Sequence, residues 1–203
     1  LLTPDVESRL KIAETLGKAN ISYAFFKVEE FEDYLGMLNI CTDISKRKDL
    51  YEENGLKVER EIEEILSKVA SQAEEPATVL FVRAFSRGAK AKKDDNMTCT
   101  ILDNLGTVNI ANKYPSLLED LSIEKIIEED PDFIFVTTMG DEEKAIEGLK
   151  NGIETNPAWS TLSAVKNDRY ILLPKDLFHY KPNKRWGESY EYLGKIIYPE
   201  IFE

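Results

Sequence analysis

The chain has 203 residues, of which 42% are hydrophobic and 32% are charged, and this balance is typical of a globular protein with a core of its own. Acidic residues outnumber basic ones by 38 to 26, which disfavours nucleic-acid binding because a phosphate backbone attracts basic surfaces. No apolar run approaches the length of about 20 residues that a membrane-spanning helix needs.

The N-terminal part of the chain alternates between helical and strand-like patterns. Residues 3–5 (Thr-Pro-Asp) form a typical helix start, and Asn20 is placed to end that helix in the left-handed conformation. Residues 21–26 predict a short strand, and an apolar stripe over residues 31–41 predicts a second helix. One strand without a neighbour makes no sheet, so we interpret residues 1–45 as the remnant of an N-terminal α/β lobe.

A long and highly charged segment follows at residues 46–75. Its apolar residues recur at helical spacing and are Val58, Ile62, Ile65, Leu66 and Val69. This spacing predicts a long helix with one narrow buried face and wide solvated flanks, which Pro76 ends. We predict that the helix connects the N-terminal remnant to a C-terminal α/β lobe at residues 76–203.

After Pro76 short apolar runs alternate with amphipathic segments. The runs predict strands, which lie at residues 78–82, 108–110, 133–138 and 169–173. A Lys-, Gly- and Asp-rich stretch after residue 82 predicts a loop. The remaining segments predict helices, which lie at residues 98–105, 122–130, 141–151 and 186–198. This alternation predicts an α/β fold: a Rossmann-like lobe with a mostly parallel sheet and helices on both faces, a long backbone helix, and a partial first lobe.

Ligands of open parallel sheets gather at the carboxyl ends of the strands. Residues 83–93, 137–140 and 176–186 follow predicted strands there, and the first and last of these segments combine cations with aromatic rings. That mixture suits a ligand with a flat or apolar body and negative groups. The candidate ligand-binding residues are Arg83, Arg87, Met139, His179, Tyr180, Arg185 and Trp186. The alternative is that these segments are ordinary surface loops.

A serine hydrolase is the alternative function. Ser86 follows a strand within Ala-Phe-Ser-Arg-Gly, which approximates the nucleophile elbow, and His179 is the only histidine. Asp132 and Asp141 lie between them and complete the order Ser, Asp, His. An elbow needs a helix that begins directly after the serine, however, and the residues that follow Ser86 have no apolar stripe. We therefore expect a binding protein and not an enzyme.

The sequence contains no metal or cofactor motif. Cys41 and Cys99 lie far apart without a CxxC pair, so we expect neither a zinc site nor a redox site. The pattern favours two buried thiols and leaves a disulfide between them open. His179 has no second metal ligand at a suitable spacing, and no glycine-rich phosphate loop is present. We expect no resident cofactor.

Three segments in the second half of the chain resemble one family. Residues 120–136 match a pattern S-x-E followed by P-D-x-I-[FVL]-[VL], residues 156–170 match P-x-W-x-x-L-x-A-V-K, and residues 105–111 match L-G-x-x-N-[IV]-A. In this order they resemble the helix-backbone (class III) solute-binding proteins of ABC importers. That family serves the uptake of iron–siderophores, haem and cobalamin.

The resemblance implies a function, partners and a location. It implies capture of an iron-chelate or corrinoid ligand between two lobes, and delivery to an ABC permease with its ATPase. Glu124 matches the surface acid that docks on the permease; a helix-start acid is the alternative. The location would be extracytoplasmic, in the cell envelope, and the protein would reach the membrane only through an N-terminal lipid anchor or the permease.

The start of the chain departs from the family pattern. The sequence opens at Leu1 and not at Met, and the first half of the N-terminal lobe is missing from it, so we expect residues to precede Leu1. A third hypothesis follows, in which the exposed half-lobe pairs with another chain as an interaction module.

Overall fold

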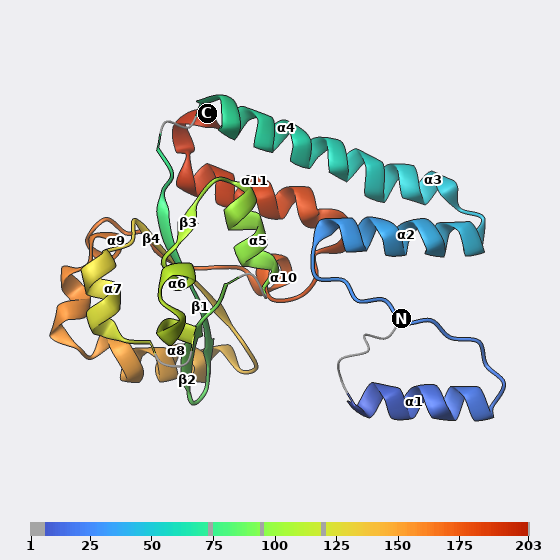
Figure 1. Ribbon diagram of the computed structural model, residues 1–203, viewed down its shortest axis with the longest axis horizontal. Helices are drawn as coiled ribbons and strands as arrows, with labels where there is room; N and C mark the ends of the chain where they lie inside the picture. Colours follow the sequence, from blue (N-terminus) through green and yellow to red (C-terminus); the bar gives the residue numbers. More distant parts are fainter. Residues whose placement is uncertain (1–6, 73–74, 94–95, 119–120, 203) are drawn as a thin grey trace. The chain divides into compact units, whose positions relative to one another are not determined.

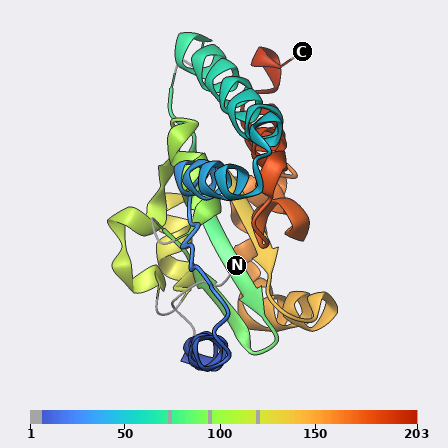
Figure 2. The same cartoon turned by 90° about the vertical axis from the view of Figure 1, so that its right-hand side faces the viewer.

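The computed structural model describes residues 7–72, 75–93, 96–118 and 121–202 (Figures 1 and 2). The chain divides into two compact units, Leu1–Val58 and Glu59–Glu203, and each is described by itself. None of the helices in the described ranges is long and apolar enough to cross a membrane.

The first unit is helical. Helix α1 (Glu7–Lys18) ends before Asn20, whose φ of 56° is the expected left-handed conformation; the predicted helix start at residues 3–5 lies outside the described residues. Helix α2 (Phe31–Ser45) follows as predicted. The predicted strand at residues 21–26 is wrong, because only Phe25 makes an isolated bridge there. A strand needs a neighbour that supplies hydrogen bonds along its length.

The predicted long helix is present with an irregularity. Helix α3 (Lys48–Tyr51), a π-helical turn (Glu52–Leu56) and α4 (Lys57–Gln72) form one continuous helical run. Gly55 lies in the π-turn, where a Cβ would meet the side chains of Leu35 and Leu38 at 3.1 Å, so glycine allows α2 to pack closely here without displacing these leucines. Along α4 the predicted apolar stripe is largely buried. The domain boundaries at residues 45 and 75 stay a prediction.

The second unit is built on a five-stranded sheet. Its strands are β1 (Thr78–Phe85), β2 (Gly88–Ala91), β3 (Val108–Asn109), β4 (Phe133–Thr138) and β5 (Tyr170–Leu172). The order is β2-β1-β4-β5, with β3 beside the start of β1. All pairings are parallel except that of β1 with β2. The predicted α/β class with a mostly parallel sheet is thus confirmed.

Strand β2 corrects the prediction of a loop after residue 82. Residues Phe85 and Gly88 pair across a two-residue turn, and Gly88 has φ +142°. A glycine adopts this backbone conformation at little cost, so the chain reverses there and forms a hairpin. The four residues of β2, Gly-Ala-Lys-Ala, have no strand-like alternation, because only the last of them, Ala91, is buried.

Helices of the second unit fall on both faces of the sheet. They are α5 (Met97–Asn104), α6 (Ile110–Lys113), α7 (Ile123–Glu129), α8 (Glu142–Leu149), α9 (Ser163–Lys166), α10 (Lys175–Phe178) and α11 (Trp186–Ile197) (Figure 1). The alternate residues Leu80, Val82 and Ala84 of β1 share one core cluster with residues of α6, α7 and α8. Phe81 of β1 and Phe178 of α10 are fully buried outside that cluster, which places α10 on the opposite face.

Candidate functional site

The sheet face that α10 covers changes from apolar to polar along its strands. Strands β1 and β4 pair in parallel with Val79 opposite Phe133, Phe81 opposite Phe135, and Arg83 opposite Thr137. Directly paired residues of neighbouring strands point to the same face. The first two pairs are apolar and buried, whereas the third is a cation beside a hydroxyl. This polar pair lies toward the carboxyl ends of both strands.

The polar groups of this last pair are buried without hydrogen bonds. Arg83 Nε and Thr137 Oγ1 have no hydrogen-bond partner among the described residues, although Thr137 is 0% exposed. Leaving a buried polar group unpaired costs about 1–3 kcal/mol, so each such group in a native structure needs an explanation, such as a bound ligand, ion or water. The two groups are therefore candidates for contacts with a ligand.

A third buried polar atom without a hydrogen bond is Nδ1 of His179. This residue follows α10, and its backbone N–H donates to the carbonyl of Lys175 at 2.9 Å. Burial lowers the pKa of His179 from its usual 6.5, and the positive charges of Arg83 and Lys175 lower it further. The imidazole is therefore neutral at pH 7. We call Arg83, Thr137 and His179 together the strand-end cradle.

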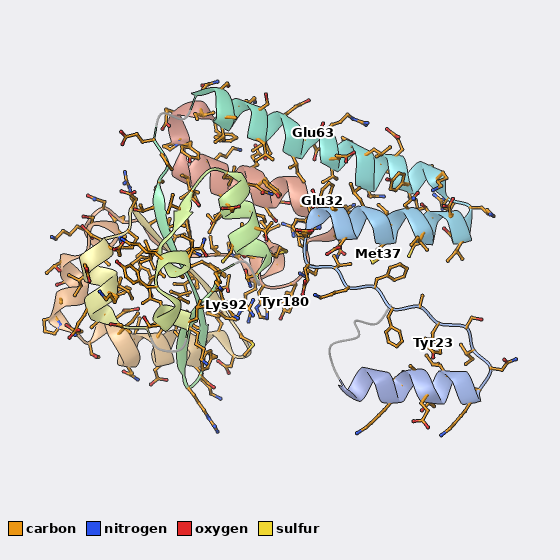
Figure 3. The ribbon with its side chains drawn as sticks, in the orientation of Figure 1. Tyr23, Glu32, Met37, Glu63, Lys92 and Tyr180 are labelled. Carbon is orange, nitrogen blue, oxygen red and sulfur yellow. The ribbon has the colours of Figure 1, made fainter. Side chains whose placement is uncertain are left out.

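The rim of the cradle is held together by backbone contacts. Met139, 46% exposed, follows β4, and its N–H donates to the carbonyl of Ala84 at 2.8 Å. The Lys175 ammonium donates to the carbonyl of Gly140 at 2.8 Å and so ties α10 to the end of β4. Tyr180, which is labelled in Figure 3, is 60% exposed. Its ring lies edge-on to that of His179, with 5.0 Å between the ring centroids. Exposed flat and polarisable side chains thus border a positively charged site.

This arrangement suits the binding of an oxyanion. Arg83 pairs across the sheet with Lys90 of β2, and the positive charges of Arg83 and Lys175 both act on His179. The cradle is thus positively charged in a chain whose net charge is -12. A carboxylate or a similar group only accepts hydrogen bonds, and the cradle offers it donors from Arg83 and Thr137.

The predicted ligand-binding residues divide into two groups. Arg83, Met139, His179 and Tyr180 lie in the cradle or at its rim. Arg87 lies outside it, exposed in the two-residue turn between β1 and β2.

Arg185 and Trp186 are not brought to the cradle. The Arg185 guanidinium donates to Glu188 at 2.6 Å and to Asp176 at 2.6 Å, and these carboxylates raise its pKa. Trp186 is 1% exposed at the start of α11. The guanidinium of Arg185 is engaged by acidic neighbours, and the ring of Trp186 is buried in the core. Neither side chain is therefore available to a ligand in this structure.

Thr137 is the cradle residue that the pattern analysis did not select. The alternation of side chains between the two faces of β1 and β4 could have indicated this residue. Arg83 and Thr137 continue two apolar rows that occupy every second position, and a polar residue in such a row is unusual. The pairing register that joins the two rows comes only from the structure.

The nucleophile elbow is not formed. Ser86 lies exposed in the turn that joins two antiparallel strands, so no helix N-terminus follows it to stabilise an oxyanion. The sequence places a glycine at position 88, and this residue reverses the chain into β2 instead of starting a helix.

The remaining candidates have simple surroundings. Glu124 is exposed in the first turn of α7. Cys41 is half-buried, Cys99 is buried, and no disulfide joins them. Within the described ranges no group of His, Cys, Asp and Glu side chains could hold a metal ion.

A mostly parallel sheet with helices on both faces and a polar cradle at its strand ends defines an α/β ligand-binding unit. The chain belongs to the periplasmic binding protein family, whose model matches residues 8–177. A search of curated proteins finds no significant match.

Solved structures with the same fold include several binding proteins. IsdE of S. aureus, complexed with heme, superposes with a TM-score of 0.77 at 17% identity and covers 98% of this chain. The periplasmic heme-binding protein RhuT of Roseiflexus sp. RS-1 gives 0.74 at 18% over 94% of the chain. The TroA-like periplasmic binding protein FepB of Veillonella parvula gives 0.76 at 16% over 100%.

The chain is shorter than these relatives. It spans 76% of the IsdE chain, 72% of RhuT and 63% of FepB, and 60% of another periplasmic binding protein from Veillonella parvula. At such low identities the similarity shows the fold alone.

Proposed function

We propose that this protein is the solute-binding component of an ABC importer and that it captures an iron chelate with carboxylate groups, such as haem or a ferric siderophore. The observation that carries the proposal is the strand-end cradle, with its buried Arg83, Thr137 and His179 atoms that have no hydrogen-bond partner among the described residues. The exposed Tyr180 beside it offers a ring against which a flat or apolar ligand body can stack.

Two observations support the choice of ligand. Two of the proteins with the same fold are described as heme-bound or heme-binding. A carboxylate-bearing chelate matches the donors of the cradle better than a ligand without negative groups does. A corrinoid stays the less favoured alternative, since nothing in the cradle points to it.

The test measures chelate binding by the 203-residue protein. Haemin, ferric citrate and cobalamin are titrated separately, and binding is followed by visible absorbance. We expect Arg83→Ala to weaken binding of the preferred chelate by roughly tenfold or more, because a charge-assisted hydrogen bond is lost. Arg87→Ala, which removes an exposed cation from the same hairpin, is the matched control and should change affinity by less than about twofold. Equal effects of the two variants, or no binding of any chelate, would contradict the proposal.

Delivery to a permease is the second part of the proposal, and Glu124 is its docking residue. Its carboxylate is exposed on α7, as a contact with an arginine of another protein requires. In cells that need this protein to take up the chelate, Glu124→Arg should abolish uptake while chelate binding by the purified protein stays unchanged. Glu128→Arg, on the same helix, is the control, and an uptake loss of the same size there would exclude a specific role for Glu124.

The location follows from these two roles. An importer component works outside the cytoplasmic membrane, so we place the protein in the cell envelope.

A further inference from the structure

The strand-end cradle contains a titratable group that faces positive charge. We infer that an oxyanion of the ligand enters this cradle together with one proton, which His179 takes up from solvent. The inference deepens the proposed function and rests on it for the ligand, but the chemistry of the cradle is testable with a simple anion.

The groups around His179 explain why its imidazole is neutral in the free protein. Arg83 of β1 and Lys175 of α10 act on it directly, and Lys90 of β2 flanks Arg83 across the sheet. Tyr180 contacts its ring edge-on. The charges that shift the pKa of His179 are both positive, so its surroundings disfavour a further positive charge.

An oxyanion in the cradle would reverse this balance. It would accept hydrogen bonds from Arg83 Nε and Thr137 Oγ1, and it would place a negative charge next to the imidazole. An opposite charge at contact distance raises a histidine pKa by about 1 or more. The imidazolium carries a hydrogen on both ring nitrogens, so the buried Nδ1 could then donate to the anion.

The sign of the pH effect follows. The pKa of His179 is low in the free protein and high in the complex, so between these two values one proton enters with each anion. Affinity is greatest below the pKa of the free protein and falls as the pH rises through the window, by up to about tenfold per pH unit. Above the pKa of the complex, affinity no longer depends on pH.

His179 is the only histidine in the chain, so its NMR signal in a histidine-labelled sample needs no assignment. The sample is the untagged 203-residue protein, titrated from about pH 5 to pH 8 with and without sodium sulfate; sodium chloride at equal ionic strength is the control. Sulfate stays fully ionised over this range, so its own protonation does not interfere. Binding is followed independently through the backbone amide signals of Arg83 and Thr137.

We expect sulfate, but not chloride, to raise the pKa of His179 by about 1, and the dissociation constant for sulfate to increase with pH. In His179→Gln, which keeps a hydrogen-bond donor but does not titrate, binding should lose this pH dependence. Arg87→Ala should keep it.

Three results would overturn the inference. These are sulfate binding that leaves the pKa of His179 unchanged, a pH dependence that survives in His179→Gln, and no response of the cradle amides to sulfate. Failure of the proposed function gives a different result, because the protein would then bind no iron chelate at any pH while His179 still responded to sulfate.

Discussion

Replacing Thr137 by Val should stabilise the free protein while it damages the binding site. Thr137 is 0% exposed in the middle of the sheet, and its hydroxyl has no hydrogen-bond partner among the described residues. Valine has nearly the same shape and suits a strand. The variant therefore removes a buried polar group that nothing satisfies and leaves the packing in place.

The size of the effect follows from the burial. An unsatisfied buried polar group costs about 1–3 kcal/mol, so we expect Thr137→Val to raise the free energy of unfolding by about 1 kcal/mol. For a chain of this length that corresponds to a rise in Tm of roughly 2–4 °C. Affinity for the chelate or for sulfate should fall at the same time, because the hydroxyl no longer donates.

Thr98 provides a matched control. It is also 0% exposed, but its hydroxyl donates to the carbonyl of Phe178 at 3.1 Å. Thr98→Val should therefore lower the free energy of unfolding by about 1 kcal/mol. Both variants are compared by urea unfolding and by thermal melting followed by circular dichroism. A loss of stability in Thr137→Val as large as that in Thr98→Val would refute the argument, since it would show that the Thr137 hydroxyl is satisfied in the free protein.

Three further predictions concern the frame of the site. Gly148→Ala should destabilise the protein by about 1–2 kcal/mol in urea unfolding, because its Cβ would lie 2.9 Å from the carbonyl oxygen of Phe85; unchanged stability would mean that α8 moves freely away from the hairpin. Asp132→Ala should cost about 2 kcal/mol in the same assay, because the carboxylate accepts two hydrogen bonds of 2.8 Å from the first residue of β1. Arg185→Gln should raise the pKa of Asp176, which the guanidinium hydrogen bond now holds below its usual value; a carboxyl NMR titration measures this, and an unchanged pKa would contradict it.

Much of the second unit could be predicted from the sequence because its signals are local. Strand β4 begins with a run of four apolar residues, and all its residues are buried, as expected of a strand covered on both faces. The side chain of Asn156 accepts a hydrogen bond from the N–H of Ala158, and Pro157 follows it. An Asn-Pro pair is typical of a turn, so the residue types alone indicate one here. Helix α11 keeps its apolar stripe in the core.

The errors have a common physical cause, which is that pairing partners are not visible in a local pattern. The run at residues 21–26 has the composition of a strand, but no neighbouring strand is available in the described part of the first unit. Strand β2 is the opposite case: its residues, Gly-Ala-Lys-Ala, have no strand-like pattern, yet they pair along β1 because Gly88 reverses the chain.

The candidate site shows the same limit. Arg83 and His179 could be selected because they are a cation and the lone histidine after predicted strands. Arg185 is also an arginine in a segment that follows a predicted strand, but its guanidinium donates hydrogen bonds to Glu188 and Asp176. Thr137 lies beside Arg83 only because of the pairing register of β1 with β4, and this register is not visible in the sequence.

The cradle and its rim differ in how they are supported, and this difference determines how the specificity of such a protein can change. Arg83 pairs with strands on both sides, and Thr137 pairs with Arg83 of β1, so an anion meets groups that need little ordering. Met139 and Tyr180 are exposed beyond the strand ends, where substitutions cost little stability. Substitutions at these two positions can therefore change which ligand shapes the protein accepts, while the contacts to the charged group of the ligand stay the same.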